Sequence, residues 1–162
     1  MKRLTTLLTL LVTVLLLVAC SEYDDDDECP FKVAVVMPSP INDWAFSQSM
    51  YDALVKIQQE KGGEDDFMFV YSDDMFVVEE AAAAIRDYAS KNYDLVIAHG
   101  LQNESSVQEI APDFPKTSFA WGTSSKTFTD EGISNVFAYE ANSQEGGYVN
   151  GVVAAIERKH RR

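Results

Sequence analysis

The sequence predicts a three-layer α/β sandwich with a mostly parallel sheet, on two observations. Short runs rich in β-branched and aromatic residues alternate with longer runs of helical periodicity. The strand-like runs are also largely apolar, which is typical of strands that helices cover on both faces. Strands and helices that alternate in this way are joined by right-handed crossovers, so we expect parallel strand pairing.

Five runs have the composition of buried strands, and the expected strands are 31–37, 67–71, 94–98, 117–121 and 136–139. The helical pattern between the first two strands places apolar residues at spacings of three and four, and Gly62-Gly63 ends it. The other expected helices are 77–88, about 103–111, and about 144–157.

The amino end has the pattern of a bacterial lipoprotein leader. The basic residues Lys2 and Arg3 precede an apolar run from Leu4 to Ala19, and Cys20 follows the small Ala19. We therefore expect cleavage before Cys20 and acylation of its thiol and freed amine, which would anchor the chain to a membrane in the cell envelope, on the periplasmic or the cell-surface side. An ordinary secretory leader with an incidental cysteine is the alternative.

The expected organisation is a leader (1–19), a lipidated cysteine with an acidic tether (20–30), an α/β lobe (31–157) and a basic tail (158–162). The tether reads SEYDDDDE after Cys20, which suits a solvated spacer or, alternatively, a surface-export signal. The chain has 26 acidic and 13 basic residues, so it would repel the phosphate backbone, and we do not expect it to bind nucleic acid. We assign no function to Cys29.

Ligands of open α/β sheets bind beyond the carboxyl ends of the strands, which points to the loops 38–46, 99–103 and 121–125. In the first loop, Asn42 or Asp43 could cap the following helix or bind a polar ligand. Trp44 offers a flat face for a planar ligand. The candidate binding residues of this loop are Asn42, Asp43, Trp44, Phe46 and Ser47, although Phe46 also fits the core stripe of the helix.

The other two loops add His99, Gly100, Trp121 and Gly122 as candidate binding residues. His99 could contact a ligand or could hydrogen-bond to backbone within its loop. Trp121 could form a wall of the pocket or close the core at the end of its strand. The sequence leaves both alternatives open.

Patterns of catalysis and of cofactor binding are weak. The serine pairs 105–106 and 124–125 lack a nucleophile-elbow pattern, and no GxGxxG loop is present. The two histidines and two cysteines do not have the spacing of a zinc site. We therefore expect a binding protein without a metal or cofactor. A hydrolase is the least favoured class.

Several motifs together resemble the basic membrane protein (BMP) family of substrate-binding lipoproteins. They are the leader with its cysteine, VAVVMP, a DWAF loop, YDLVIAHG, EIAPDFP and NVFAYEANSQEGGYVNGVVAA. The last contains a segment similar to the EGxYLAGxxAA helix of the family. The resemblance runs from about Phe31 to Ile156 and implies the first lobe of a periplasmic-binding-protein-like fold.

The resemblance also implies a function. Members of this family capture small molecules, purine nucleosides among them, and deliver them to the permease of an ABC importer. Ser47 stands where the nucleoside-binding branch has an asparagine, and Trp121-Gly122 replaces an acidic strand end. Family members have two lobes, whereas this chain reaches the end of the first, as a truncated receptor would. A one-lobed surface lipoprotein with a structural or protein-binding role is the alternative.

Overall fold

The computed structural model describes residues 30–160. The leader, Cys20 and all of the tether except Pro30 lie outside the described residues. The strands are β1 (Phe31–Val36), β2 (Phe67–Ser72), β3 (Leu95–Ala98), β4 (Ser118–Gly122) and β5 (Val136–Tyr139). The α-helices are α2 (Phe46–Glu60), α3 (Val78–Ser90), α4 (Glu104–Ile110) and α5 (Ser143–His160), and short 3₁₀ turns occupy Leu101–Asn103, Ala111–Asp113 and Thr129–Glu131.

The five strands form one sheet in the order β2-β1-β3-β4-β5, and every pair is parallel. The chain moves from β1 outward to β2 and then returns past β1 to β3, so the strand order reverses between β1 and β3. In an open α/β sheet, this reversal brings two loops together at the carboxyl edge and opens a crevice there. The predicted fold class is confirmed.

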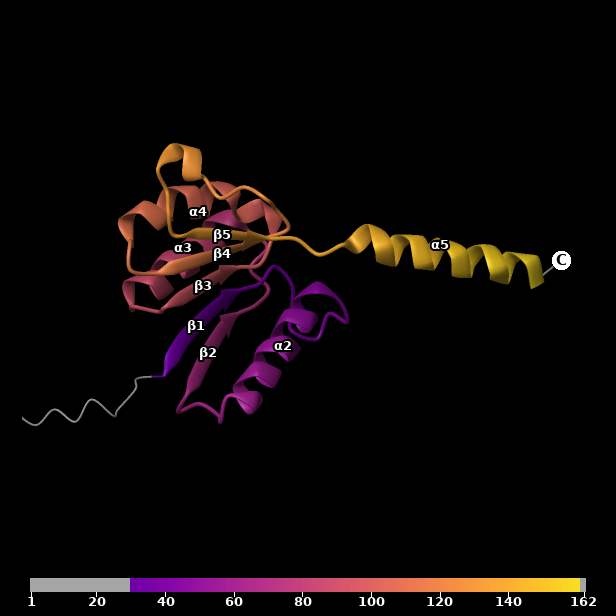
Figure 1. Cartoon of the computed structure of the whole chain (residues 1–162), viewed down its shortest axis with the longest axis horizontal. Coiled ribbons are helices and arrows are strands. Elements are labelled where there is room, and N and C mark those ends of the chain that lie inside the picture. The colour runs from indigo at the N-terminus through magenta and orange to yellow at the C-terminus, as the bar shows by residue number, and fades with distance from the viewer. Residues whose placement is uncertain (1–29, 161–162) are drawn as a thin grey trace, which may run out of the picture.

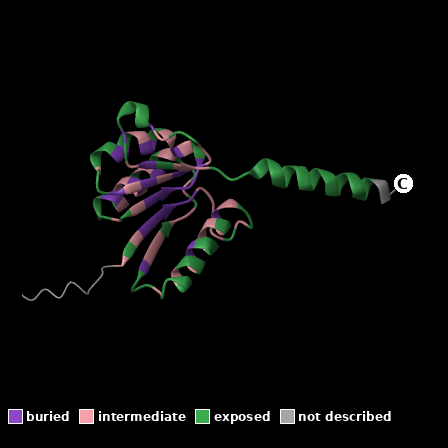
Figure 2. Cartoon of the chain, viewed as in Figure 1, coloured by how far each residue is buried: buried purple, intermediate pink, exposed green. Residues whose placement is uncertain are grey.

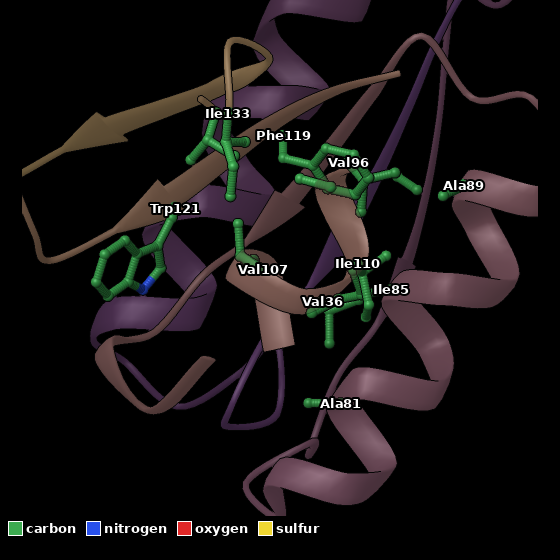
Figure 3. Packing of buried hydrophobic residues seen from close by; sticks show 14 of the residues in the cluster. Val36, Ala81, Ile85, Ala89, Val96, Val107, Ile110, Phe119, Trp121 and Ile133 are labelled. Atoms are coloured by element: carbon green, nitrogen blue, oxygen red, sulfur yellow. The ribbon is translucent and has the colours of Figure 1, made fainter. Parts of the chain in front are cut away.

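Helices cover the sheet on both faces, as Figure 1 shows, which gives the three layers. On one face, α3 and α4 pack over a core that includes Ile85, Val96, Val107 and Phe119, all fully buried or nearly so (Figure 3). On the other face, Leu54 of α2 joins a smaller cluster from β1, β2 and β3: Val33, Val35, Met37, Phe67 and Ile97. Alternate residues of a strand belong to different clusters because successive side chains of a strand point to opposite faces of the sheet.

Local sequence explains where α3 begins and ends. Glu79 and Glu80 lie in its first turn, where negative charge interacts favourably with the helix dipole. Ala81, Ile85 and Ala89 recur at a spacing of four and form its buried side. The helix ends before Asn92, which adopts the left-handed conformation that asparagine tolerates. The expected helix 77–88 is therefore present with a shift of one or two residues.

Helix α5 lies apart from the packed elements. It extends from the end of β5 into solvent (Figure 1), and every residue from 140 to 158 is exposed (Figure 2). The sequence assigned this helix to the lobe, and the structure forms the helix but places it outside the packed body. Within residues 30–160, no helix is both long enough and apolar enough to cross a membrane.

Candidate ligand-binding site

The predicted residues surround the carboxyl edge of the sheet, close to the reversal of strand order. The loop after β1 leads into α2, while the loops after β3 and β4 emerge from the neighbouring strands. Ile41 of the first loop donates its amide hydrogen to Asp73 Oδ2 (3.0 Å), which ties this loop to the one that follows β2. The sheet topology thus gathers residues that are far apart in the sequence.

Asp43, and not Asn42, caps α2. Its carboxylate accepts hydrogen bonds from the backbone amides of Ala45 (2.8 Å), Ser47 (3.2 Å) and Gln48 (3.1 Å). Desolvation would raise the pKa of Asp43, but these three amides outweigh it and lower the pKa below its ordinary value. Most of the hydrogen-bonding capacity of the carboxylate is therefore used within the loop.

Trp44 stands at the tip of this loop with 91 % of its surface exposed. Its backbone has φ 57°, in the left-handed region that a bulky residue seldom adopts. The amide of Trp44 donates to Gln48 Oε1 at 3.0 Å, which helps to hold this conformation. An indole held in solvent by a strained backbone is free to stack on a ligand.

Phe46, His99 and Tyr139 form one connected group of rings at the carboxyl edge of the sheet. The rings of Phe46 and His99 stack with centroids 3.7 Å apart, and the ring of Tyr139 lies nearly parallel at 6.1 Å from that of His99. His99 Nε2 lies 3.0 Å from the carbonyl oxygen of Phe46, and Nδ1 lies 2.6 Å from the Tyr139 hydroxyl. His99 thereby links the ends of β3 and β5 to the start of α2.

These contacts determine the tautomer of His99. A carbonyl oxygen can only accept, so Nε2 carries the hydrogen, and the neutral ring then accepts at Nδ1 from the Tyr139 hydroxyl. Burial lowers the pKa of His99 below its usual value, although the Phe46 carbonyl and the charge of Asp43 act in the opposite direction. Burial also raises the pKa of Tyr139, which keeps its hydroxyl protonated as the donor. Both ring nitrogens of His99 are engaged by the protein itself.

Gly122 makes room for Tyr139. A Cβ atom at Gly122 would lie 2.6 Å from the Tyr139 hydroxyl oxygen and 2.7 Å from Cζ of the same ring. Trp121, the preceding residue, is fully buried and stacks on Phe128 on the α3 side of the sheet (Figure 3). Its indole donates to the carbonyl oxygen of Gly100 at 3.1 Å. Trp121 therefore fills the end of the core, and its hydrogen bond to Gly100 holds the loop after β3.

Two other predicted residues have distinct environments. Asn42 is exposed beside the cap, whereas Ser47 is fully buried and accepts a hydrogen bond from the amide of Ser39 at 3.1 Å. The structure thus brings Phe46 and His99 into direct contact, and Tyr139 links Gly122 to them. Asp43 caps the loop before Phe46, and Trp44 is exposed to solvent at the tip of that loop. Ser47 and Trp121 lie in the interior.

The candidate residues predicted from the sequence omit Tyr139, and they also omit Gln102 and Asn103, although the predicted loop 99–103 contains both. Tyr139 is the partner of His99, and its position at the carboxyl end of the fifth expected strand was the available signal. In the loop after β3, the Gln102 Nε2 and Asn103 Oδ1 atoms are buried without a hydrogen-bond partner among the described residues. Buried polar atoms that lack a protein partner are sites for water or for a polar ligand.

Other surface hollows lie away from these residues. One of about 280 Å³ separates α3 from α4 and includes Arg86, and another of about 690 Å³ lies between α4 and the loop 126–131. A third, of about 510 Å³, runs along β2 and α2 beside Tyr51. None of the predicted binding residues lines these three hollows. Residues 30–160 contain no cluster of histidine, cysteine and acidic side chains suited to a metal ion.

Comparison with known proteins is consistent with this architecture. The sequence model of the Bmp family, described as ABC transporter substrate-binding protein PnrA-like, matches residues 31–161. A solute-binding protein of an ABC transporter system from Conexibacter woesei is 22 % identical with a TM-score of 0.54, over 67 % of this chain and 34 % of the other. A corresponding protein from Aeropyrum pernix is 18 % identical with a TM-score of 0.54, over 68 % of this chain and 28 % of the other.

A lipoprotein fragment from Peptoclostridium difficile is 24 % identical with a TM-score of 0.54, over 76 % of this chain and 96 % of the other. At these identities the likeness establishes the fold. The chain spans about a third of the length of the first two proteins. The fold therefore corresponds to one lobe-sized part of these longer proteins.

The chain belongs to the Bmp family of PnrA-like ABC transporter substrate-binding proteins. This confirms the resemblance found in the sequence. The family consists of binding proteins and not of enzymes, which agrees with the absence of a catalytic pattern in the sequence.

Proposed function

We propose that this chain is the ligand-capturing lobe of a membrane-anchored solute-binding lipoprotein that serves an ABC importer. The observation that carries the proposal lies at the carboxyl edge of the sheet, where the loop after β1 exposes Trp44 to solvent two residues before Phe46, whose ring stacks on that of His99. An exposed indole offers a flat face on which a planar ligand can stack. Membership of the Bmp family supports the same class of function.

The ligand proposed for this edge is a purine nucleoside or a related small molecule. A purine would stack on the exposed ring of Trp44. His99 and Asp43 would act indirectly, His99 by fixing the ring of Phe46 and Asp43 by holding the Trp44 loop. Asn42, Gly100 and Gly122 would border the site, and Ser47 and Trp121 would support it from the interior.

Tryptophan fluorescence tests the ligand-binding part of this proposal. The chain has two tryptophans, and Trp121→Phe leaves the exposed Trp44 as the only reporter. Titration with inosine, guanosine or adenosine should quench or blue-shift the emission of Trp44. Thermal shift of the unmodified chain should show stabilisation that Trp44→Ala abolishes.

The matched control is Phe31→Ala. Phe31 is an aromatic residue with 49 % exposure at the opposite, amino end of β1, so its removal should leave ligand binding unchanged. An absence of any response at millimolar nucleoside would count against binding of purine nucleosides by this lobe.

Membrane attachment is a separate part of the proposal and rests on the leader and Cys20. Cys20→Ser should move the protein from the detergent-rich to the aqueous phase in a detergent partition and should abolish incorporation of labelled palmitate. Retention of both properties by this variant would contradict lipidation at Cys20.

A protein-binding role is the second candidate function, and the exposed α5 favours it. Tyr148, Val149, Val152, Val153 and Ile156 are all exposed on this helix. If this role is the main one, a partner should be recovered equally well by the unmodified chain and by Trp44→Ala.

A further inference from the structure

Helix α2 begins with an enlarged form of the capping box. In the standard box, the side chain of the N-cap residue accepts from the backbone amide three residues later, and a glutamine or glutamate at that later position bonds back to the N-cap amide. In this chain, Asp43 Oδ1 accepts from the amide of Gln48 (3.1 Å), and Gln48 Oε1 accepts from the amide of Trp44 (3.0 Å). Asp43 and Gln48 are five residues apart. The box therefore has room for two additional residues, Trp44 and Ala45, and both are exposed.

The first of these two residues has an unfavourable backbone conformation. Trp44 has φ 57°, in the left-handed region, which is an outlier for a bulky residue. Such a conformation persists only where the surrounding structure determines it. The indole does not supply that constraint, because a side chain that is 91 % exposed makes few contacts with the protein. Hydrogen bonds to the backbone of the loop therefore have to hold Trp44 in place.

Gln48 provides the bond that acts on Trp44 itself. The amide of Trp44 can only donate, so the carboxamide of Gln48 is oriented with its oxygen toward this amide. Among the described residues, Gln48 Oε1 is the one hydrogen-bond partner of the amide. The stretch before Trp44 is anchored separately, since the amide of Ile41 donates to Asp73 Oδ2 at 3.0 Å. Loss of the Gln48 acceptor would thus release the tip of the loop without releasing its base.

We propose that Gln48 is a positioning residue of the candidate ligand-binding site. Its carboxamide oxygen fixes the left-handed turn at Trp44 and keeps the indole presented to a planar ligand, a role that rests on the function proposed above for Trp44. Gln48 acts through Trp44 and makes no contact of its own with the ligand. A side chain that is ordered before binding loses less conformational freedom when the ligand binds, which raises the affinity.

Two substitutions at position 48 separate the acceptor from the rest of the side chain. Gln48→Leu keeps a high helix propensity but offers no acceptor to the Trp44 amide, whereas Gln48→Glu retains both the length and the acceptor. The three hydrogen bonds that Asp43 accepts remain possible in both variants, so α2 should still form, which circular dichroism checks. Gln59→Leu is the matched control, because Gln59 is an exposed glutamine of the same helix.

Fluorescence anisotropy of Trp44 in the absence of ligand tests the positioning role. In a Trp121→Phe background of the full-length chain, Trp44 is the only tryptophan. Gln48→Leu should lower the anisotropy of the indole, because the tip of the loop gains motion. Gln48→Glu and Gln59→Leu should retain the anisotropy of the background. An unchanged anisotropy in Gln48→Leu would overturn the proposal, and so would an equal fall in Gln48→Glu.

Titration of the same variants with inosine and guanosine distinguishes this role from the proposed function. Gln48→Leu should raise Kd by about two- to tenfold, the factor expected when one more side chain has to be ordered on binding. The factor should be the same for both nucleosides, because Gln48 acts through the ring of Trp44 and does not bond to the base. Unequal factors would indicate direct contact with the ligand and would contradict the proposal. An absence of nucleoside binding in every variant, with the expected anisotropies, would contradict the proposed ligand and would still support the positioning of Trp44 by Gln48.

Discussion

At the carboxyl edge of the sheet, one buried imidazole connects three elements. His99 is only 3 % exposed, and its two nitrogens bond the start of α2 and the end of β5. A buried nitrogen without a partner costs more free energy than a hydrogen bond gains, so the Tyr139 hydroxyl matters for stability as well as for geometry.

Removal of that hydroxyl is the most direct probe of the group. Tyr139→Phe keeps the ring but leaves His99 Nδ1 unsatisfied, and we expect the free energy of unfolding to fall by about 1–3 kcal/mol. Urea denaturation followed by circular dichroism measures it. The control is Tyr148→Phe, because Tyr148 is 75 % exposed and its hydroxyl contacts water. Equal stabilities of Tyr139→Phe and the unmodified chain would show that the bond is absent in solution.

The same histidine should make stability depend on pH. Because burial lowers the pKa of His99 from its ordinary value of 6.5, the unfolded chain binds a proton at a pH where the folded chain does not. His99 therefore contributes its full stability above about pH 6.5 and loses it as pH falls from there toward the folded pKa. The urea midpoint should be lower at pH 5.5 than at pH 7.5. His99→Gln should reduce this difference, and an unchanged difference would assign it to other groups.

For three of the candidate residues, the residue type alone does not show whether the side chain contacts a ligand or supports the structure. His99, Trp121 and Ser47 are polar or amphipathic side chains at strand or helix ends, a pattern that both roles share. Burial separates them, and burial depends on the face of the sheet to which each residue points and on the residues that the fold brings opposite. Tyr139 lies 40 residues from His99 in the sequence, so only the sheet register brings the two together.

At the scale of elements, the start of α2 depends on Asp43. Its carboxylate satisfies three amides that would otherwise lack partners at the amino end of the helix. Asp43→Ala should therefore lower Tm by about 2–6 °C, as loss of a helix cap does in a domain of this size. Differential scanning fluorimetry measures the change, with Asp52→Ala, an exposed aspartate within the same helix, as the matched control. A comparable loss in the control would attribute the effect to charge and not to capping.

Strands and helices were predictable to within a few residues because each has a strong local signal. Apolar β-branched runs mark the strands, and apolar residues at spacings of three and four mark α2. The position of α5 had no such signal. Its apolar arc predicts a buried side, yet an amphipathic pattern does not say whether the surface that covers it belongs to the same chain.

At the scale of the whole molecule, packing stability should be divided unevenly between the sheet body and α5. The buried clusters of the described region draw on β1 to β5 and on α2, α3 and α4, whereas α5 is exposed along residues 143–158. An isolated helix of this length is marginal in water, and Gly146, Gly147 and Gly151 weaken it further.

Hydrogen exchange should show this division. Amides of α5 should exchange with little protection, because residues 143–158 of the helix bury no side chain, while those of β1, β3 and β4 should be strongly protected within the sheet. Protection of α5 as strong as that of β3 would contradict the exposed position of the helix.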